Sequence, residues 1–179
     1  AHINTVSAVP SDSVYKQILI DSDNFLAEQM LILISDQLED TLSSQTTIDF
    51  VMENYLAELQ NEIYWVDGSG LSRYNQVTPN AMVHVLEHIY HKIPREKLFY
   101  LLPESGISGT LEKSLSGISG YVHAKTGSMT HVYNLSGYLE TKSGKTLLFS
   151  FMNNNFNVSF SELKQEMEQV LSVFVNDLK

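Results

Sequence analysis

The 179-residue sequence contains no cysteine. This absence excludes disulfide bonds, thiolate metal sites and cysteine nucleophiles. Basic residues are also scarce, because 11 Lys and Arg side chains face 21 acidic ones and give a formal net charge of −10. Proteins that bind nucleic acid or anionic membranes need clustered basic side chains. We therefore expect no nucleic-acid partner and no adsorption to a lipid surface.

Long apolar runs and flexible linkers are missing as well. No stretch approaches the roughly 18 apolar residues of a membrane-spanning helix, so we expect no transmembrane segment. No repeat or Pro- and Gly-rich tract divides the chain, and a hydrophobic fraction of 43% suits a folded protein. Residues 1–179 are therefore predicted to form a single unit. Ten acidic residues and one basic residue fall within residues 1–60, a pattern that indicates a solvated acidic face or a docking surface for something cationic.

The first half of the sequence has the apolar spacing of helices. Ser11 or Ser13 is a candidate cap for a short first helix, and the polar residues 21–24 interrupt the pattern before a second helix from about Phe25. A third helix is predicted over residues 48–59. Thr78 followed by Pro79 indicates the start of a fourth. Residues 103–120 are rich in Gly and Ser and are predicted to form an extended loop.

The second half changes character. Three strands are predicted, over Tyr121–Ala124, Val132–Glu140 and Thr146–Met152. Ser159 and Glu162 then have the spacing of a capping box that opens a final helix. One face of this helix is predicted to carry Leu163, Met167, Val170, Leu171 and Phe174. The pattern predicts an α+β fold in which helices pack on antiparallel strands.

Two short motifs could carry chemistry. Ser22-Asp23-Asn24 lies between two predicted helices, and Lys125-Thr126-Gly127 is predicted to end a strand. Each motif alone is unspecific, because Ser, Asp and Asn commonly cap helices and a Lys-Thr-Gly turn has no obligatory function. Together they match the S-D-N and K-T-G motifs that accompany an S-x-x-K nucleophile in penicillin-binding proteins and class A β-lactamases.

Five blocks occur in the order of one family: S-D-N-F-L-A-E (22–28), D-G-S-G-L-S-R (67–73), L-P-E-S-G-I-S-G-T-L (102–111), H-A-K-T-G-S (123–128) and L-S-G-Y-L (135–139). The sequence thereby resembles class C low-molecular-mass penicillin-binding proteins, the D-alanyl-D-alanine carboxypeptidase/endopeptidase family. The resemblance implies a β-lactamase/transpeptidase-like fold, with a helical cluster on an antiparallel sheet and a C-terminal helix. It further implies acyl-enzyme chemistry without a cofactor or metal, peptidoglycan stem peptides and β-lactams as partners, and export to the bacterial periplasm or cell envelope.

The resemblance also implies roles for catalytic residues. Ser22 would be the middle hydroxyl of a proton relay. Asn24 would bind the substrate's amide carbonyl and touch the catalytic lysine. Lys125 would hold Ser22 and provide positive potential for the peptide carboxylate.

The substrate-binding residues follow directly in the sequence. Thr126 would donate a hydrogen bond to the peptide carboxylate, and Gly127 would leave the strand edge open for the peptide. The backbone N–H of Ser128 would form half of an oxyanion hole.

The nucleophile is where the sequence departs from the family pattern. Only 21 residues precede Ser22, whereas a long interval is expected between S-x-x-K and S-D-N. Ser13-Val14-Tyr15-Lys16 fits S-x-x-K, but nine helical residues would place Ser13 about 13 Å from Ser22. We therefore expect Ser13 to be a helix cap. The chain is expected to be the C-terminal part of the catalytic domain, inactive without its nucleophile half.

Two alternatives remain open. His84-Val85-Leu86-Glu87-His88 fits the inverted zinc-peptidase motif H-x-x-E-H, with Glu162 or Glu166 as a third ligand; three histidines on a polar helix face are the simpler explanation. The other alternative is a non-catalytic module that binds muropeptides.

Overall fold

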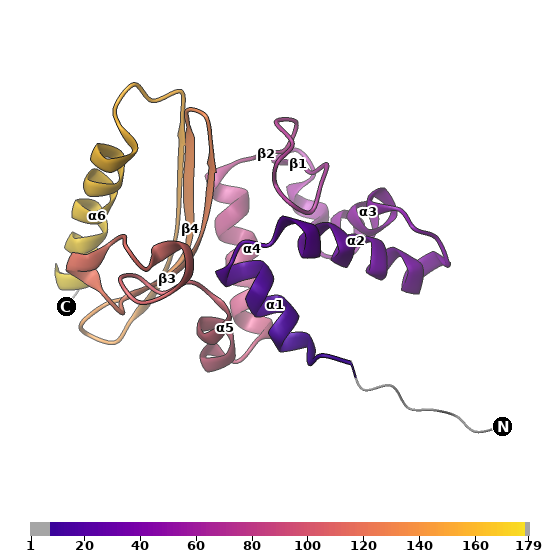
Figure 1. Ribbon diagram of the computed structural model, residues 1–179, viewed down its shortest axis with the longest axis horizontal. Coiled ribbons are helices and arrows are strands. Elements are labelled where there is room, and N and C mark those ends of the chain that lie inside the picture. Colours follow the sequence, from indigo (N-terminus) through magenta and orange to yellow (C-terminus); the bar gives the residue numbers. More distant parts are fainter. Residues whose placement is uncertain (1–7, 178–179) are drawn as a thin grey trace.

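The structure, a computed structural model, describes residues 8–177 as a three-stranded sheet between two helical layers, with a further helical lobe beside it (Figure 1). The helices are α1 (Ser11–Ile20), α2 (Asn24–Glu39), α3 (Ser44–Asn54), α4 (Pro79–Lys92), α5 (Arg95–Leu101) and α6 (Phe160–Asp177), with 3-10 turns η1 (Ala57–Leu59), η2 (Gly109–Leu111) and η3 (Ser116–Ile118). The strands are β1 (Ile63–Tyr64), β2 (Gln76–Val77), β3 (Val122–Met129), β4 (Val132–Glu140) and β5 (Thr146–Asn154). The predicted α+β class is confirmed.

The central sheet is an antiparallel meander in the order β3-β4-β5. Successive side chains of a strand point to opposite faces, and β4 shows this clearly. Tyr133, Leu135 and Leu139 belong to the core that includes α6, whereas Tyr138 belongs to the core formed with α4 and α5. The Tyr138 hydroxyl donates a 2.7 Å hydrogen bond to the Leu86 carbonyl of α4. The sheet is therefore covered on both faces.

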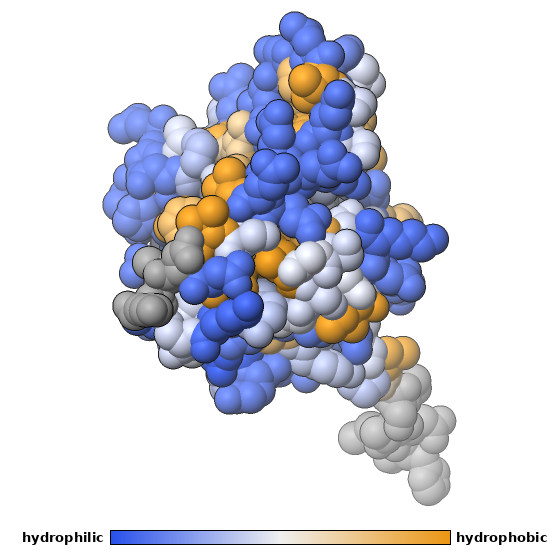
Figure 2. All heavy atoms as spheres, turned by 90° about the vertical axis from the view of Figure 1, so that its left-hand side faces the viewer, coloured by the Kyte–Doolittle hydropathy of each residue, from blue (hydrophilic) through white to orange (hydrophobic). Residues whose placement is uncertain are grey.

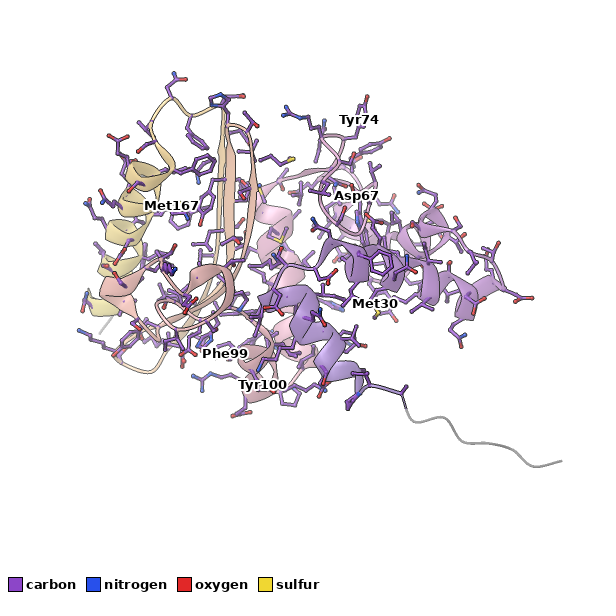
Figure 3. All side chains as sticks on the ribbon, viewed as in Figure 1. Met30, Asp67, Tyr74, Phe99, Tyr100 and Met167 are labelled. Carbon is purple, nitrogen blue, oxygen red and sulfur yellow. The ribbon has the colours of Figure 1, made fainter. Side chains whose placement is uncertain are left out.

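Helix α6 begins at the predicted capping box. The Ser159 N–H donates to the Glu162 carboxylate, and the Glu162 N–H donates to the Ser159 hydroxyl. One helix face is buried against the sheet, and Figure 3 shows Met167 in this layer. The buried residues of this face are Leu163, Met167, Leu171 and Val175.

The other two apolar residues predicted for this face, Val170 and Phe174, are 43% and 44% exposed. Phe174 lines a groove together with residues of the edge strand β5, among them Leu147 and Phe149. Figure 2, which looks onto the α6 side, shows apolar surface in separate patches among polar side chains.

The helical lobe contains α2, α3 and the small β1-β2 sheet. The Thr47 hydroxyl of α3 donates to the Leu31 carbonyl of α2 at 2.6 Å, and both residues are buried. The third helix ends at Asn54, five residues earlier than predicted, and Leu59 is buried in η1 instead. Polar contacts thus fix the two helices against each other.

The loop between β1 and β2 is ordered around Asp67, whose carboxylate accepts hydrogen bonds from the N–H groups of Gly70 and Ser72. Figure 3 shows Asp67 in this loop and Tyr74 at its outer end. The Glu28 carboxylate of α2 accepts hydrogen bonds from the N–H groups of Gly68 and Ser69. The loop is therefore held against the first turns of α2.

Two local expectations are corrected near α1 and α5. Helix α1 starts at Ser11 after Pro10 and has no side-chain cap, so neither Ser11 nor Ser13 caps it. Helix α5 was not predicted, because it is only seven residues long and also starts after a proline without a capping side chain. Within residues 8–177, no helix combines the length and apolar character needed to cross a membrane.

Candidate active site

Ser22, Asp23 and Asn24 form the connection between α1 and α2, and their side chains have three different environments. Ser22 is in the left-handed backbone region, with φ at 60°. The Asp23 carboxylate accepts a 2.9 Å hydrogen bond from the Leu26 N–H and caps α2. Asn24 is the first residue of α2 and is exposed. Capping therefore explains Asp23 but neither of its neighbours.

Lys125 of β3 contacts this connection, although it lies 103 positions after Ser22 in the sequence. Its ammonium donates to the Ser22 hydroxyl at 2.6 Å and to the Thr126 carbonyl at 3.1 Å. The contact that the motif chemistry predicted is thus present. The Lys-Thr-Gly motif does not end its strand, however, because β3 continues to Met129 in full register with β4.

The Lys125 ammonium is a half-buried positive charge. Burial lowers the pKa of Lys125 below its usual value, because desolvation disfavours the charged form. Among the residues that the structure describes, no carboxylate lies within the 4.0 Å of an ion pair with it. Two of its three N–H donors are used by Ser22 and Thr126. One donor and an uncompensated charge are therefore available to an anion.

The outer edge of β3 is covered along only part of its length. The Ser105 N–H donates to the Val122 carbonyl, and the Ala124 N–H donates to the Pro103 carbonyl. Backbone groups of an extended strand alternate in direction with a period of two residues. The N–H of Ser128, four residues after Ala124, consequently points to the same outer edge, where Gly127 and Ser128 are exposed.

Gly127 is not required by the packing of the chain itself. A Cβ added there would meet no atom closer than 4.0 Å, and its φ is outside the left-handed region. Gly137, on the neighbouring strand, is the opposite case, since an added Cβ would lie 2.3 Å from the His123 carbonyl oxygen. Gly127 is exposed, so the position that a side chain would occupy is open to solvent.

Thr126 is the next residue along β3. Its hydroxyl donates a 2.9 Å hydrogen bond to the hydroxyl of Thr110 in η2. The sequence did not single out Thr110 as a site residue, because the two threonines are 16 positions apart and only the fold brings them together.

Neither S-x-x-K pattern of the sequence lies with this group. Ser13 is exposed on α1, and the Lys16 ammonium lies 3.8 Å from the centroid of the Tyr100 ring. A second pattern, missed above, joins Ser161 and Lys164 at the start of α6. The Lys164 ammonium lies 5.2 Å from the Tyr133 ring centroid, in the layer behind the sheet. Both lysines are engaged with aromatic rings rather than with a serine.

The zinc arrangement considered above is not formed. His84 and His88 are exposed on α4, whereas Glu162 and Glu166 are on α6, across the sheet (Figure 1). No cluster of three or more potential metal-ligating side chains is found in the described part of the chain. Glu162 is instead used in the capping box of α6.

Comparison with known proteins identifies the family of the chain. The profile of the D-Ala-D-Ala carboxypeptidase 3 (S13) family matches residues 3–176. The chain belongs to this family. It is 32% identical over 167 residues to penicillin-sensitive carboxypeptidase A of Dictyostelium discoideum, covering 86% of this chain and 32% of that protein. It is 28% identical to D-alanyl-D-alanine carboxypeptidase DacB of Haemophilus influenzae, covering 87% and 34%.

Solved structures show the same fold. Penicillin-binding protein 4 of Haemophilus influenzae superimposes with a TM-score of 0.78 at 26% identity, covering 92% of this chain and 39% of that one. The TLA-1 extended-spectrum β-lactamase reaches a TM-score of 0.68 at 17% identity, covering 92% and 64%. The β-lactamase/transpeptidase-like fold is thereby confirmed. The S13 chain described here spans about a third of the length of the curated relatives above.

Proposed function

We propose that this chain forms the peptide-binding and proton-relay side of a serine-type D-Ala-D-Ala carboxypeptidase/endopeptidase that acts on peptidoglycan stem peptides. The observation that carries the proposal is the 2.6 Å contact between the Lys125 ammonium and the Ser22 hydroxyl. A hydroxyl held against an ammonium can pass a proton to a departing amine, which is the step that acyl transfer from an amide requires.

The same lysine attracts the substrate's terminal carboxylate. Lys125 has an unused N–H donor and no carboxylate partner in the described residues, and the Thr126 hydroxyl is beside it on the strand. A charge-assisted hydrogen bond to a carboxylate is stronger than one between neutral groups. In this proposal the carboxylate lies at the outer edge of β3, between these two donors.

The reacting carbonyl would lie one step further along β3. A peptide that pairs with the open edge passes Gly127, where the absent side chain leaves room, and reaches the outward N–H of Ser128. That N–H is suited to stabilise the developing oxyanion of the tetrahedral intermediate. Asn24, exposed at the start of α2, is the group that binds the substrate's amide carbonyl.

The isolated chain is proposed to lack a serine nucleophile and to be inactive toward peptides. Ser13 and Ser161 are outside the Lys125 group, and the lysine of each pattern lies over an aromatic ring. A fluorescent penicillin should therefore not label the 179-residue chain. Labelling mapped by mass spectrometry to either serine would contradict this part of the proposal. Export to the periplasm or cell envelope follows from the proposed substrate.

Peptide binding tests the proposal directly. The probes are a short peptide ending in D-Ala-D-Ala and the same peptide with a C-terminal amide, titrated into the chain by NMR or calorimetry. The acid should bind about 10-fold or more tightly than the amide, because a hydrogen bond to a charged group contributes about 1.5–3 kcal/mol. Lys125→Ala should abolish the preference.

The matched control is Lys142→Ala, which removes an exposed lysine from the turn between β4 and β5. It removes one positive charge, as Lys125→Ala does, and should leave the preference for the acid intact. Equal binding of acid and amide by the wild type, or equal effects of the two lysine substitutions, would contradict the proposed carboxylate site.

A non-catalytic muropeptide-binding module would share this carboxylate preference. It would not require the Ser22 hydroxyl against the ammonium, and this contact is what favours a catalytic role.

A further inference from the structure

The G-T-L block at residues 109–111 lies against both halves of the candidate site. Gly109 has φ at +55°, and an added Cβ would lie 2.7 Å from the Ile20 carbonyl oxygen and 2.8 Å from Ile20 Cγ2. Ile20 is the last residue of α1, two positions before Ser22. Glycine is therefore required at 109 for η2 to approach the Ser22 connection this closely.

The next residue, Thr110, meets the opposite half of the site. Its hydroxyl oxygen is 2.9 Å from that of Thr126, in a geometry where Thr126 donates. A threonine hydroxyl has one proton and can accept two hydrogen bonds. Two hydroxyls in contact therefore form one bond between them and have one proton left to donate outward.

The contact with Thr110 affects how the Thr126 hydroxyl can bind an anion. When Thr126 donates to Thr110, its own proton is used. When Thr126 turns its proton to a carboxylate, it can accept the proton of Thr110 in return. The Thr126 oxygen then stays hydrogen-bonded in both states. A hydroxyl that accepts one hydrogen bond becomes a better donor in the next, by an estimated 10–30% per bond.

We propose that Thr110 is a positioning residue for the substrate carboxylate: with Thr126 it forms a two-hydroxyl chain whose donor direction reverses when the carboxylate binds. The inference rests on the proposed function, since the ligand is the C-terminal carboxylate of a D-Ala-D-Ala peptide. It gives the Gly-Thr pair a joint purpose. Gly109 sets the distance of η2 from the Ser22 connection, and Thr110 orients the Thr126 hydroxyl from the same turn.

The test uses the 179-residue chain, the D-Ala-D-Ala peptide and its C-terminal amide. Thr110→Val removes the hydroxyl at nearly constant volume and should weaken binding of the acid about 5- to 10-fold, as expected for one neutral hydrogen bond. Binding of the amide should change less than about twofold. Thr110→Ser restores the hydroxyl and should restore the affinity for the acid. In a Thr126→Val background, Thr110→Val should have no further effect, because the two hydroxyls act as one unit.

The outcomes of this test distinguish failure of the proposed function from failure of the Thr110 inference. If the wild type does not distinguish acid from amide, the proposed function fails, and the Thr110 inference fails with it. If the wild type prefers the acid and Thr126→Val weakens that preference while Thr110→Val does not, only the inference is overturned. Equal losses for acid and amide in Thr110→Val, together with a lower melting temperature, would also overturn it by showing a structural role alone.

Discussion

The Lys125 ammonium and the Ser22 hydroxyl are 2.6 Å apart, although 103 positions separate the two residues in the sequence. Lys125 belongs to the sheet and Ser22 to the connection between two helices. The contact therefore exists only when the sheet and the helical lobe are assembled in one arrangement. A substitution that moves the sheet away from this connection would therefore also break the contact between Lys125 and Ser22.

Gly127 and Gly137 should respond oppositely to alanine. Gly127→Ala meets no atom of the chain within 4.0 Å, so the free energy of unfolding should stay within about 0.5 kcal/mol of wild type. Its affinity for the D-Ala-D-Ala peptide should fall, because the methyl group occupies the proposed peptide path. Gly137→Ala places a Cβ 2.3 Å from the His123 carbonyl oxygen and should destabilise the protein by about 3 kcal/mol or more.

Urea denaturation measures the free energy of unfolding of both variants, and peptide titration measures the affinity of Gly127→Ala for the D-Ala-D-Ala peptide. Unchanged peptide affinity in Gly127→Ala would remove the support that this glycine gives to the proposed binding edge.

Ser22 combines a left-handed backbone with a functional contact. Ser22→Gly should be more stable than Ser22→Ala by about 1 kcal/mol, because only glycine adopts φ near 60° without strain. Both variants lose the hydrogen bond to Lys125. If Ser22 serves the proton relay, both should keep the wild-type affinity for the peptide acid within about threefold, well below the loss of a charge-assisted contact. Chemical denaturation and the titration above check the two statements, and equal stabilities would show that the backbone is unstrained.

His123 should make the fold sensitive to acid. It is 7% exposed, and its Nδ1 is buried without a hydrogen-bond partner in the described residues. Burial and the nearby Arg95 guanidinium lower the pKa of His123 to about 4. Glu140, which faces the ring at 3.6 Å, is itself paired with Arg95, and Phe99 stacks on the ring with centroids 4.3 Å apart.

The lowered pKa of His123 makes stability depend on pH, because the folded and unfolded chains bind different numbers of protons. Between pH 4 and pH 6.5 the unfolded chain binds a proton that the folded chain excludes, so stability rises with pH through this window and is reduced below it. The lowering of the His123 pKa from 6.5 to about 4 corresponds to about 3 kcal/mol. His123→Phe should flatten this part of the pH profile of the unfolding free energy, whereas His88→Gln, at an exposed position, should leave it unchanged. A wild-type slope retained in His123→Phe would assign the acid sensitivity to other groups.

Asp23 should contribute to stability and not to binding. Asp23→Ala removes the acceptor for the Leu26 N–H at the start of α2 and should cost about 1 kcal/mol. Asp23→Ser, which retains a capping oxygen, should recover most of this loss. A thermal melt of both variants measures the effect. A large loss of peptide affinity at unchanged stability would show that Asp23 takes part in the site itself.

Periodicity and capping chemistry predicted most of the fold. Thr78 caps α4 at the predicted proline, and the bond between the Ser159 hydroxyl and the Glu162 N–H opens α6 as expected. These signals are local, because the residues that make the contact are three positions apart. β4 was likewise predicted with its observed limits, Val132–Glu140.

The features that the sequence did not predict depend on tertiary contacts between distant segments. β3 extends five residues beyond the predicted end at Ala124, because its pairing with β4 outweighs the turn preference of Gly127. The link from Thr126 to Thr110 depends on where η2 lies, and no pattern within residues 103–120 indicates that. The motif residues could be selected from the sequence, but the side chains that orient them could not.

Backbone groups of the chain itself already pair with one end of the outer edge of β3. Pro103 and Ser105 already occupy the edge positions at Ala124 and Val122. A peptide that pairs outward from Ser128 toward Thr126 can therefore advance by about two residues, or roughly 7 Å of extended chain, before it meets this backbone. A free C-terminus fits within that length, whereas a chain that continues in the same direction must leave the edge. In the proposed function, Pro103 and Ser105 would therefore limit how much peptide can follow the reacting carbonyl along β3.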